Sequence, residues 1–274
     1  MTRNVPKRIL PAIVFSQFAG TSLWFAGNAV LTQEGLNDHL PAGSVATITS
    51  AVMFGFILGT FVFALFSVAD RFKPSVVFLA CAILGAIANF SVIAFSDSLT
   101  GWIVCRAFTG FFLAGIYPVG MKIASDWYKG GLGKALGYLV GALVLGTAFP
   151  HLLNYLGGSL DWEYVLLGTS FLAFLGGFVM FSMVGEGPNR KKGASFQPKK
   201  IFDVFRKPDF RAAAFGYFGH MWELYTFWAF LPIIITYYNF ENPGGEGLHP
   251  SLWTFLIIAI GAIACVLGGI WSSK

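Results

Sequence analysis

Eight long runs of apolar residues dominate the sequence, and each is long enough to cross a lipid bilayer. The chain of 274 residues is 56% hydrophobic and only 11% charged, whereas a soluble domain carries about 25% charged residues. Backbone polar groups cannot stay unpaired in lipid, so runs of about 18 or more apolar residues must form helices. The sequence therefore predicts an all-α integral membrane protein with transmembrane helices at 9–31, 46–68, 76–95, 101–123, 135–157, 164–184, 213–238 and 252–271.

The positive charges lie almost entirely on one side of this predicted bundle. None of the 18 lysines and arginines falls in the connections 32–45, 96–100, 158–163 and 239–251. Lys122 lies at the basic end of a predicted helix, and Arg106 alone lies away from that side. The positive-inside rule assigns the basic side to the cytoplasm. We therefore predict a multi-pass protein of the cell inner membrane with a cytoplasmic N-terminus. The net charge of +5 then reflects topology, and the predicted partner is membrane lipid, with no nucleic acid.

One long basic connection separates six predicted helices from the last two. We predict three parts: an N-terminal six-helix transmembrane bundle at 1–184, a basic cytoplasmic linker at 185–211, and the first two helices of an incomplete C-terminal bundle at 212–274. Two six-helix halves related as parallel repeats are a known transporter design.

Two segments, together with this layout, carry a resemblance to a known family. In FSVADRF, Asp70 and Arg71 match part of a Gly-x-x-x-Asp-Arg loop motif, with Phe66 in place of its glycine. The segment RAFTGFFLAGIYPVG, residues 106–120, is similar to the same family's motif in the fourth helix. The chain resembles the major facilitator superfamily (MFS) of usually twelve-helix secondary transporters, and would end after helix 8. The resemblance implies an MFS-type bundle of bacterial type whose partners include the remaining C-terminal helices of the full-length transporter. It also implies a gating role for Asp70 and Arg71, which would latch the two halves together.

Glu223 and His220 are ionisable residues inside a predicted span, and inserting such side chains into lipid costs free energy. They lie three apart in GYFGHMWELYTFWAFLP, residues 216–232, and therefore share a helix face. Counted from residue 212, Glu223 is about 16 Å deep, near the middle of an about 30 Å hydrocarbon core. Burial penalises the charged carboxylate, so we predict that Glu223 exchanges a proton near neutral pH and that His220 tunes it. The alternative is a structural hydrogen bond to a neighbouring helix.

A polar and aromatic stripe follows one face of the first predicted helix. The resemblance implies that helices 1, 4 and 7 line a central cavity, so this stripe is where we expect substrate contacts. Arg106 either reaches the nearer membrane surface or faces the cavity and binds an anion, and His151 is interpreted as a structural residue. The alternative for the stripe is hydrogen bonding between helices. The predicted substrate-binding residues are Gln17, Trp24, Asn28, Arg106, Tyr117 and Tyr217.

Proton-coupled secondary active transport of a small molecule or ion by alternating access is therefore the predicted function. No phosphate-binding loop or hydrolase pattern occurs, and the three cysteines lie singly, so we predict no enzyme activity, no cofactor and no metal site. Two alternatives stay open. One is a non-transporting membrane scaffold or sensor of the same fold, and the other is an intramembrane enzyme that uses Glu223 and His220 as acid and base. The substrate and the direction of transport do not follow from the sequence.

Overall fold

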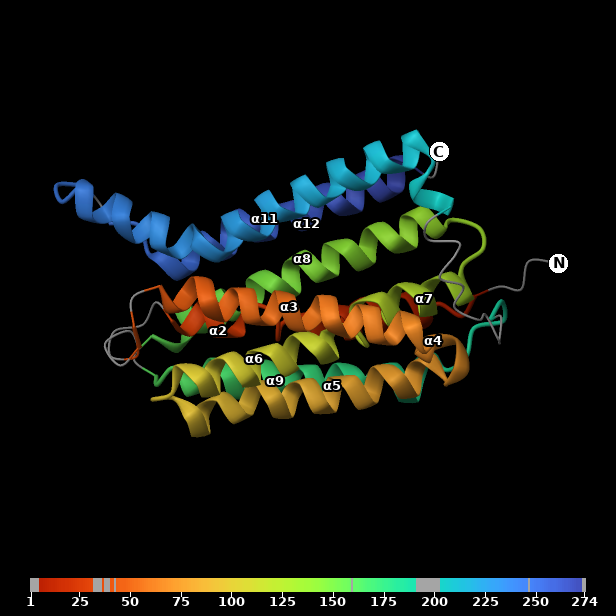
Figure 1. Cartoon of the computed structure of the whole chain (residues 1–274), viewed down its shortest axis with the longest axis horizontal. Helices are drawn as coiled ribbons and strands as arrows, with labels where there is room; N and C mark the ends of the chain where they lie inside the picture. Colours follow the sequence, from red (N-terminus) through yellow and green to blue (C-terminus); the bar gives the residue numbers. More distant parts are fainter. Residues whose placement is uncertain are drawn as a thin grey trace.

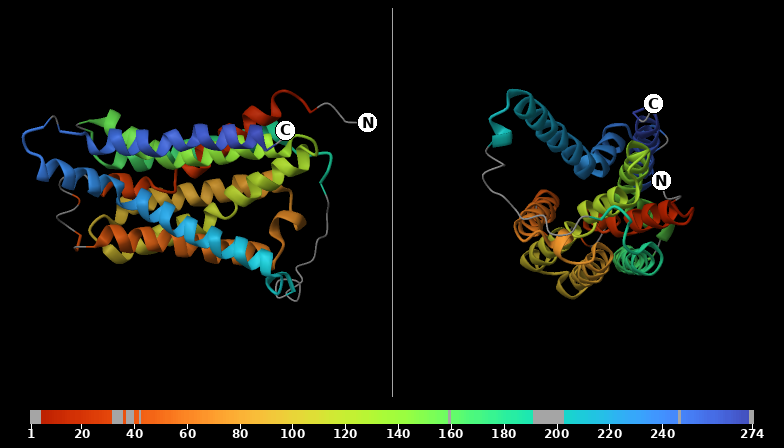
Figure 2. Two further views of the ribbon diagram at one scale, coloured as in Figure 1. Left: turned by 90° about the horizontal axis from the view of Figure 1, so that it is seen from above. Right: turned by 90° about the vertical axis from the view of Figure 1, so that its right-hand side faces the viewer.

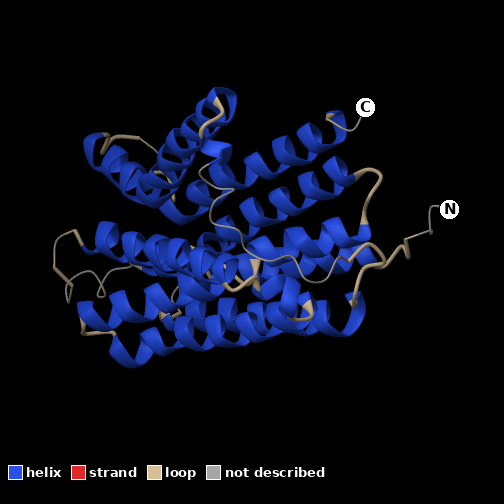
Figure 3. Cartoon of the chain, turned by 45° about the vertical axis from the view of Figure 1, so that its right-hand side comes forward, coloured by secondary structure: helices blue, strands red, loops and turns tan. Residues whose placement is uncertain are grey.

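The chain folds into long, roughly parallel helices that run up and down one axis (Figure 1). A computed structural model describes residues 5–31, 36, 40–41, 43–158, 160–190, 203–245 and 247–272. Every regular element in those ranges is a helix, as predicted (Figure 3). The elements are α1 (Ile9–Thr21), α2 (Ala26–Val30), α3 (Ser44–Leu65), α4 (Val68–Arg71), α5 (Pro74–Ser91), η1 (Val92–Phe95), α6 (Leu99–Leu113), α7 (Tyr117–Trp127), α8 (Leu132–Gly157), α9 (Glu163–Val179), η2 (Met180–Val184), α11 (Pro208–Glu241) and α12 (Pro250–Trp271).

The observed helices follow the eight predicted spans in order. Among the described residues, six helical segments are long and apolar enough to cross a membrane, and three of them consist of two consecutive helices: Ser44–Leu65, Pro74–Phe95, Leu99–Trp127, Leu132–Gly157, Glu163–Val184 and Pro250–Trp271. The apolar helix Ile9–Thr21 is shorter. The 34-residue α11 is outside this set because charged and polar aromatic residues lower its hydropathy.

Two predicted spans are interrupted where the sequence pattern suggested continuous helices. The first breaks between Thr21 and Ala26, and the fourth breaks between Leu113 and Tyr117. In the fourth span, Pro118 lies in the first turn of α7, where proline is tolerated because the backbone N–H it lacks would be unpaired anyway. The break in the first span exposes backbone carbonyls inside the bundle, and these become acceptors in the site described below.

Glycines let the helices of the first bundle approach closely. A Cβ atom at Gly110 of α6 would lie 1.9 Å from the Val52 carbonyl oxygen of α3, and one at Gly55 would lie 1.9 Å from the Ala107 carbonyl oxygen. Lipid provides no hydrophobic force between helices, so close backbone packing at small residues is what holds them together. These contacts fix α3 against α6.

The two ends of the molecule differ in charge. We call the end that holds the start of α1, the start of α11 and the end of α12 the basic end, and the opposite one the acidic end (Figures 1 and 2). Consecutive long helices connect the two ends alternately. The predicted linker 185–211 includes residues 191–202, which lie outside the described residues.

The helices α11 and α12 contact the first six spans in different ways. Along its length α12 packs on α8, where Gly269 meets Gly137. The buried residues of α11 all lie in the half nearer the acidic end: Trp228, Ala229, Leu231, Pro232 and Ile235. The half of α11 nearer the basic end has none. The first bundle and α11 are therefore closed against each other only toward the acidic end.

Candidate functional site

Arg106 is fully buried and binds the broken part of the first span. Its Nη2 donates to the carbonyl oxygens of Leu23, at 3.0 Å, and Trp24, and its Nη1 donates to Asn89 Oδ1 at 2.7 Å. No carboxylate in the described part of the chain pairs with it. Helix carbonyls that lack an N–H partner thus satisfy a buried cation, and the cation in turn stabilises the helix break.

Asn89 extends this network to the sixth span. Its Nδ2 donates to Thr169 Oγ1 at 3.2 Å, to Ser170 Oγ at 3.0 Å and to the Leu166 carbonyl oxygen at 3.2 Å. One buried polar network therefore joins α5, α6, α9 and the break after α1. Asn89 was not among the predicted site residues, although a buried asparagine inside an apolar run is a visible signal.

The polar stripe of the first span is buried, and its members have different surroundings. Asn28 Nδ2 donates to Thr49 Oγ1 at 2.7 Å. Both amide atoms of Gln17 lack a hydrogen-bond partner among the described residues, as does Trp24 Nε1. Gln17 Oε1 lies against Gly120 of α7. Gln17 and Trp24 thus present unpaired donors and acceptors between the first and fourth spans, where a polar ligand can bind them.

Aromatic rings join the first span to α11. The Trp24 ring stacks on Tyr225 with centroids 5.5 Å apart, and Phe25 stacks on Tyr225 at 6.3 Å. Trp228 meets Phe25 and Tyr225 edge-on at 6.3 and 5.6 Å. The first span runs from the basic end to the acidic end, so these four rings, the aromatic gate below, lie between Gln17 and the acidic end, and Asn28 lies beyond them. The sequence reasoning included Trp24 but missed Tyr225 and Trp228, whose spacing of three along an apolar helix was the available signal.

Tyr117 and Tyr217 lie next to this gate. Tyr117 of α7 and Tyr217 of α11 are each close enough to Tyr225 for the three groups to interact electrostatically. Tyr117 is half-buried, whereas Tyr217 is 57% exposed. The structure thus brings three predicted substrate residues, Trp24, Tyr117 and Tyr217, to the region between the first bundle and α11, whereas the Gln17 amide lies against α7. Asn28 and Arg106 bind other parts of the first bundle.

Glu223 and His220 lie on the exposed surface of α11. The burial that the sequence argument assumed for Glu223 is therefore not observed, because the half of α11 that carries it packs on no other described helix closely enough to bury a residue. Neither forms an ion pair with another described residue. They occupy the half of α11 that has no buried residue, next to Tyr217 and on the basic-end side of the aromatic gate. A carboxylate at this place can exchange protons with the solvent on the basic-end side of the aromatic gate.

Asp70 and Arg71 lie at the basic end, in and around α4. Asp70 pairs with Lys122 of α7 at 3.1 Å, and Lys122 also contacts Asp126 at 3.4 Å. Arg71 is exposed. The observed partners of Asp70 are therefore within the first bundle, and the contact it makes joins α4 to α7.

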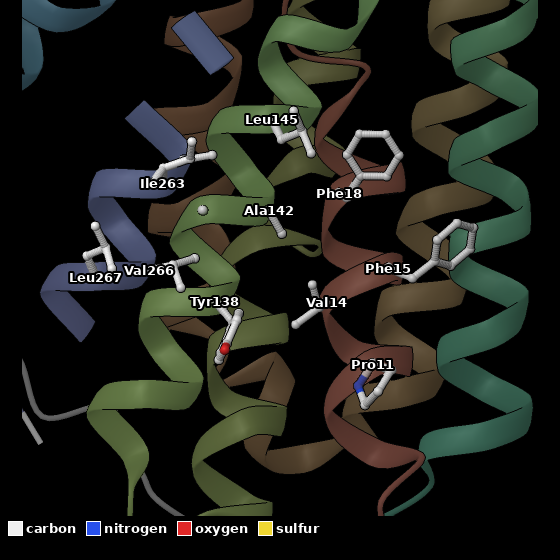
Figure 4. A pocket seen from close by; sticks show the side chains of 12 residues that line it. Pro11, Val14, Phe15, Phe18, Tyr138, Ala142, Leu145, Ile263, Val266 and Leu267 are labelled. Atoms are coloured by element: carbon white, nitrogen blue, oxygen red, sulfur yellow. The ribbon is translucent and has the colours of Figure 1, made fainter. Parts of the chain in front are cut away.

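A separate apolar pocket lies where α1, α8 and α12 meet (Figure 4). Its volume is about 580 Å³. Apolar side chains from all three helices point into it, and Tyr138 supplies a hydroxyl. None of the predicted site residues lines it, and its lining suits an apolar occupant better than a polar solute. The lining residues are Pro11, Val14, Phe15, Phe18, Tyr138, Gly141, Ala142, Leu145, Ala262, Ile263, Val266 and Leu267.

The chain is similar to known membrane transporters. No curated protein matches it, but 13 chains of solved structures do. One is the MFS proton:xylose symporter XylE bound to 6-bromo-6-deoxy-D-glucose, with a TM-score of 0.63 and 17% sequence identity, covering 95% of this chain and 68% of that one. At this identity the likeness shows the fold. The family model described as Major Facilitator Superfamily matches residues 9–274. This protein therefore belongs to the major facilitator superfamily, a family of secondary transporters and not of enzymes.

Proposed function

We propose that the protein moves a small, uncharged, hydrogen-bonding solute across the cytoplasmic membrane by alternating access, coupled to protons through Glu223. The basic end would face the cytoplasm, in accord with the positive-inside rule. The observation that carries the proposal is the set of unpaired, buried polar atoms on Gln17 and Trp24 of the first span, whose Trp24 ring stacks on Tyr225 of α11. Buried polar groups of this kind need a partner, and a bound solute supplies it.

The surroundings of Arg106 favour an uncharged solute over an anion. The two terminal nitrogens of its guanidinium already donate to the carbonyls of Leu23 and Trp24 and to Asn89. An anion would have to displace these acceptors and reopen the helix break. Rings such as Trp24 and Tyr225 also favour a solute with an apolar face, because such a face can stack on them.

The aromatic gate supports an alternating-access cycle in which this conformation is closed at the acidic end. Trp24 and Phe25 belong to the first bundle, whereas Tyr225 and Trp228 belong to α11. Separation of these pairs would open the solute site toward the acidic end. A transporter of this kind must break contacts between its bundles at one end and form them at the other, so that its site opens to each side in turn.

Glu223 is proposed as the coupling residue because it is a carboxylate inside a span, two residues before Tyr225 of the gate, and its exposure lets a proton reach it. The XylE structure is that of a proton:xylose symporter, which supports proton coupling as a hypothesis for a chain of the same fold. His220, one turn before Glu223, is proposed to share the proton.

The test is solute-driven proton movement in proteoliposomes that contain the full-length protein. With a panel of neutral solutes we expect acidification or alkalinisation of the lumen in the wild type and its loss in Glu223→Gln. Glu241→Gln is the matched control, because Glu241 is an exposed carboxylate at the other end of the same helix, and it should behave as the wild type. Normal coupling in Glu223→Gln would refute the proton role, and absence of any solute flux in the wild type would favour a scaffold.

A second test concerns the solute. Gln17→Leu keeps the side-chain size and removes both unpaired amide atoms. We expect the KM for the transported solute to rise about tenfold, the loss of about one hydrogen bond to a buried group, while the protein stays folded. An unchanged KM would exclude Gln17 from the solute site.

A further inference from the structure

The contact between α8 and α12 is a seam that joins the first bundle to the second, and its register is fixed by several contacts. At the acidic end, the rings of Tyr155 and His249 lie 4.7 Å apart, and Asn154 Nδ2 donates to Ser251 Oγ at 3.0 Å. At the basic end, Gly137 meets Gly269. The two helices are antiparallel, so a move of a few residues toward the N-terminus of α8 corresponds to a move of about as many residues toward the C-terminus of α12. Residue 151, three before Asn154, therefore faces residue 254, three after Ser251.

His151 and Thr254 are both fully buried in this seam. Both ring nitrogens of His151 and the Thr254 hydroxyl lack a hydrogen-bond partner among the described residues. Thr254 is unusual in this respect. The other buried threonines, Thr21, Thr49, Thr109, Thr147 and Thr169, each donate to the carbonyl four residues earlier in their own helix.

The elements packed against α8 place no counter-charge on His151. The helices α1 and α2 carry no titratable side chain. Arg106 lies beyond α2, against Gly27, while the Ala29 carbonyl on another face of α2 accepts from Asn154. None of the remaining titratable groups on the elements packed against α8 bonds to the imidazole. These groups are Cys265 on α12, His249 just before it, Tyr117, Lys122 and Asp126 on α7, Glu163 and Tyr164 on α9, and Lys134, Tyr138 and Tyr155 on α8.

These surroundings distinguish the two protonation states of His151. A neutral imidazole and a hydroxyl can both be satisfied by one bound water molecule between them, since such a water makes two to four hydrogen bonds. An imidazolium without a counter-charge in the same dry seam is strongly unfavourable. It becomes favourable only when the seam separates and water reaches it.

We propose that His151 and Thr254 form a proton-responsive lock in the seam. The neutral imidazole, joined to the Thr254 hydroxyl through one water molecule, holds the acidic end shut. A proton that reaches His151 from that end opens it. The proposed lock rests on the proposed function in one respect, because it requires that the two bundles move against each other. It does not require that Glu223 carries the coupled proton.

The experiment measures the distance between spin labels on the two bundles at the acidic end. Leu160 and Phe240 are suitable sites because they are 47% and 78% exposed. The labels are attached to Leu160→Cys and Phe240→Cys in the full-length protein in lipid nanodiscs, with Cys81, Cys105 and Cys265 replaced by alanine. We expect the distance to lengthen as the pH falls below about 6.5, the ordinary imidazole pKa that water restores in the open seam.

His151→Gln, which keeps hydrogen-bonding capacity but cannot be protonated, should hold the short distance at every pH. His249→Gln is the matched control, because His249 is an exposed histidine at the mouth of the same seam, and it should respond as the wild type. A wild-type response in His151→Gln, or a wild type that does not respond to pH, overturns the lock.

Thr254→Val keeps the proposal testable if His151→Gln does not fold, since valine has nearly the same shape as threonine. It removes the anchor of the bound water and weakens the closed seam, so the midpoint of the distance change should rise by about half a pH unit. An unchanged midpoint would show that Thr254 does not stabilise the closed seam, and it would overturn the proposed lock. Solute flux in the same samples separates the two proposals: flux without the expected distance changes rejects only the lock, whereas a wild type without flux rejects the transport proposal.

Discussion

Arg106 shows how one residue in an apolar helix can determine the path of another helix. Its guanidinium donates to the carbonyls that the break after α1 leaves unpaired and to Asn89, while its buried Nε has no hydrogen-bond partner among the described residues. The sequence predicted either a surface anchor or an anion-binding group for this residue. Complete burial against backbone carbonyls explains why the cation is tolerated without a carboxylate, because charge-assisted hydrogen bonds replace its hydration.

Replacement of Arg106 should therefore cost stability as well as activity. Arg106→Gln leaves the Leu23 and Trp24 carbonyls without their donor, at a cost of about 2–4 kcal/mol, and should lower the melting temperature by roughly 5–10 °C. The measurement is thermal unfolding in detergent, followed by intrinsic tryptophan fluorescence. Arg211→Gln, at an exposed position of α11, is the control and should melt as the wild type. An unchanged melting temperature in Arg106→Gln would contradict the structural role.

At the scale of elements, backbone contacts at glycine determine which helices pair. The crossing of α3 and α6 brings Gly110 against the Val52 carbonyl, and no side chain is present to yield if a methyl group is added. Helices in lipid gain stability from such close approaches, so loss of the approach is not offset by a hydrophobic force.

Gly110→Ala should be strongly destabilising for this reason. A Cβ atom there would lie 1.9 Å from the Val52 carbonyl oxygen, and separating the two backbones should cost about 3 kcal/mol. We expect a lower melting temperature and a smaller monodisperse fraction in size-exclusion chromatography. Gly216→Ala on α11, where a Cβ atom would meet nothing within 4 Å, is the control. Equal behaviour of the two variants would contradict the packing argument.

The ion pair between α4 and α7 permits a second test at this scale. Asp70 and Lys122 are 28% and 22% exposed, so Asp70→Asn should cost only about 0.5–1 kcal/mol, and less at high salt. This outcome, measured as melting temperature at low and high ionic strength, fits a pair within one bundle. If Asp70 instead latches the two halves in another state of the cycle, Asp70→Asn will change the distance distribution between labels on the two bundles.

For the whole molecule, the seam of α8 and α12 is the continuous contact between the first bundle and the second. Its glycines keep the two backbones close at the basic end, and its polar residues gather toward the acidic end. The aromatic gate makes a second contact between the same two parts. Movement of one bundle against the other must change at least one of these contacts.

Gly269→Ala tests the role of close approach in that movement. The added Cβ atom would lie 2.6 Å from Gly137 Cα, which favours any state in which the seam is wider. A bias of about 1.4 kcal/mol toward one state would reduce solute flux about tenfold. Gly268→Ala is the matched control, since a Cβ atom at the neighbouring residue meets nothing within 4 Å. Equal flux in both variants would show that close packing here is not needed for transport.

The sequence by itself determined the class of protein, the order of the spans and the division of charge between the two ends. Each of these follows from local composition, because about 20 apolar residues in a row have no stable alternative to a membrane helix. The sequence also proposed Gln17, Trp24, Tyr117 and Tyr217 as substrate residues, and that role stays a prediction.

The tertiary structure alone decided what each of these side chains contacts. The break after α1 depends on donors from Arg106 far along the chain, and the isolation of His151 depends on the register between α8 and α12. Hydropathy and helical periodicity describe one helix at a time. Whether a buried polar atom is paired or unpaired is a property of two helices, and only their packing fixes it.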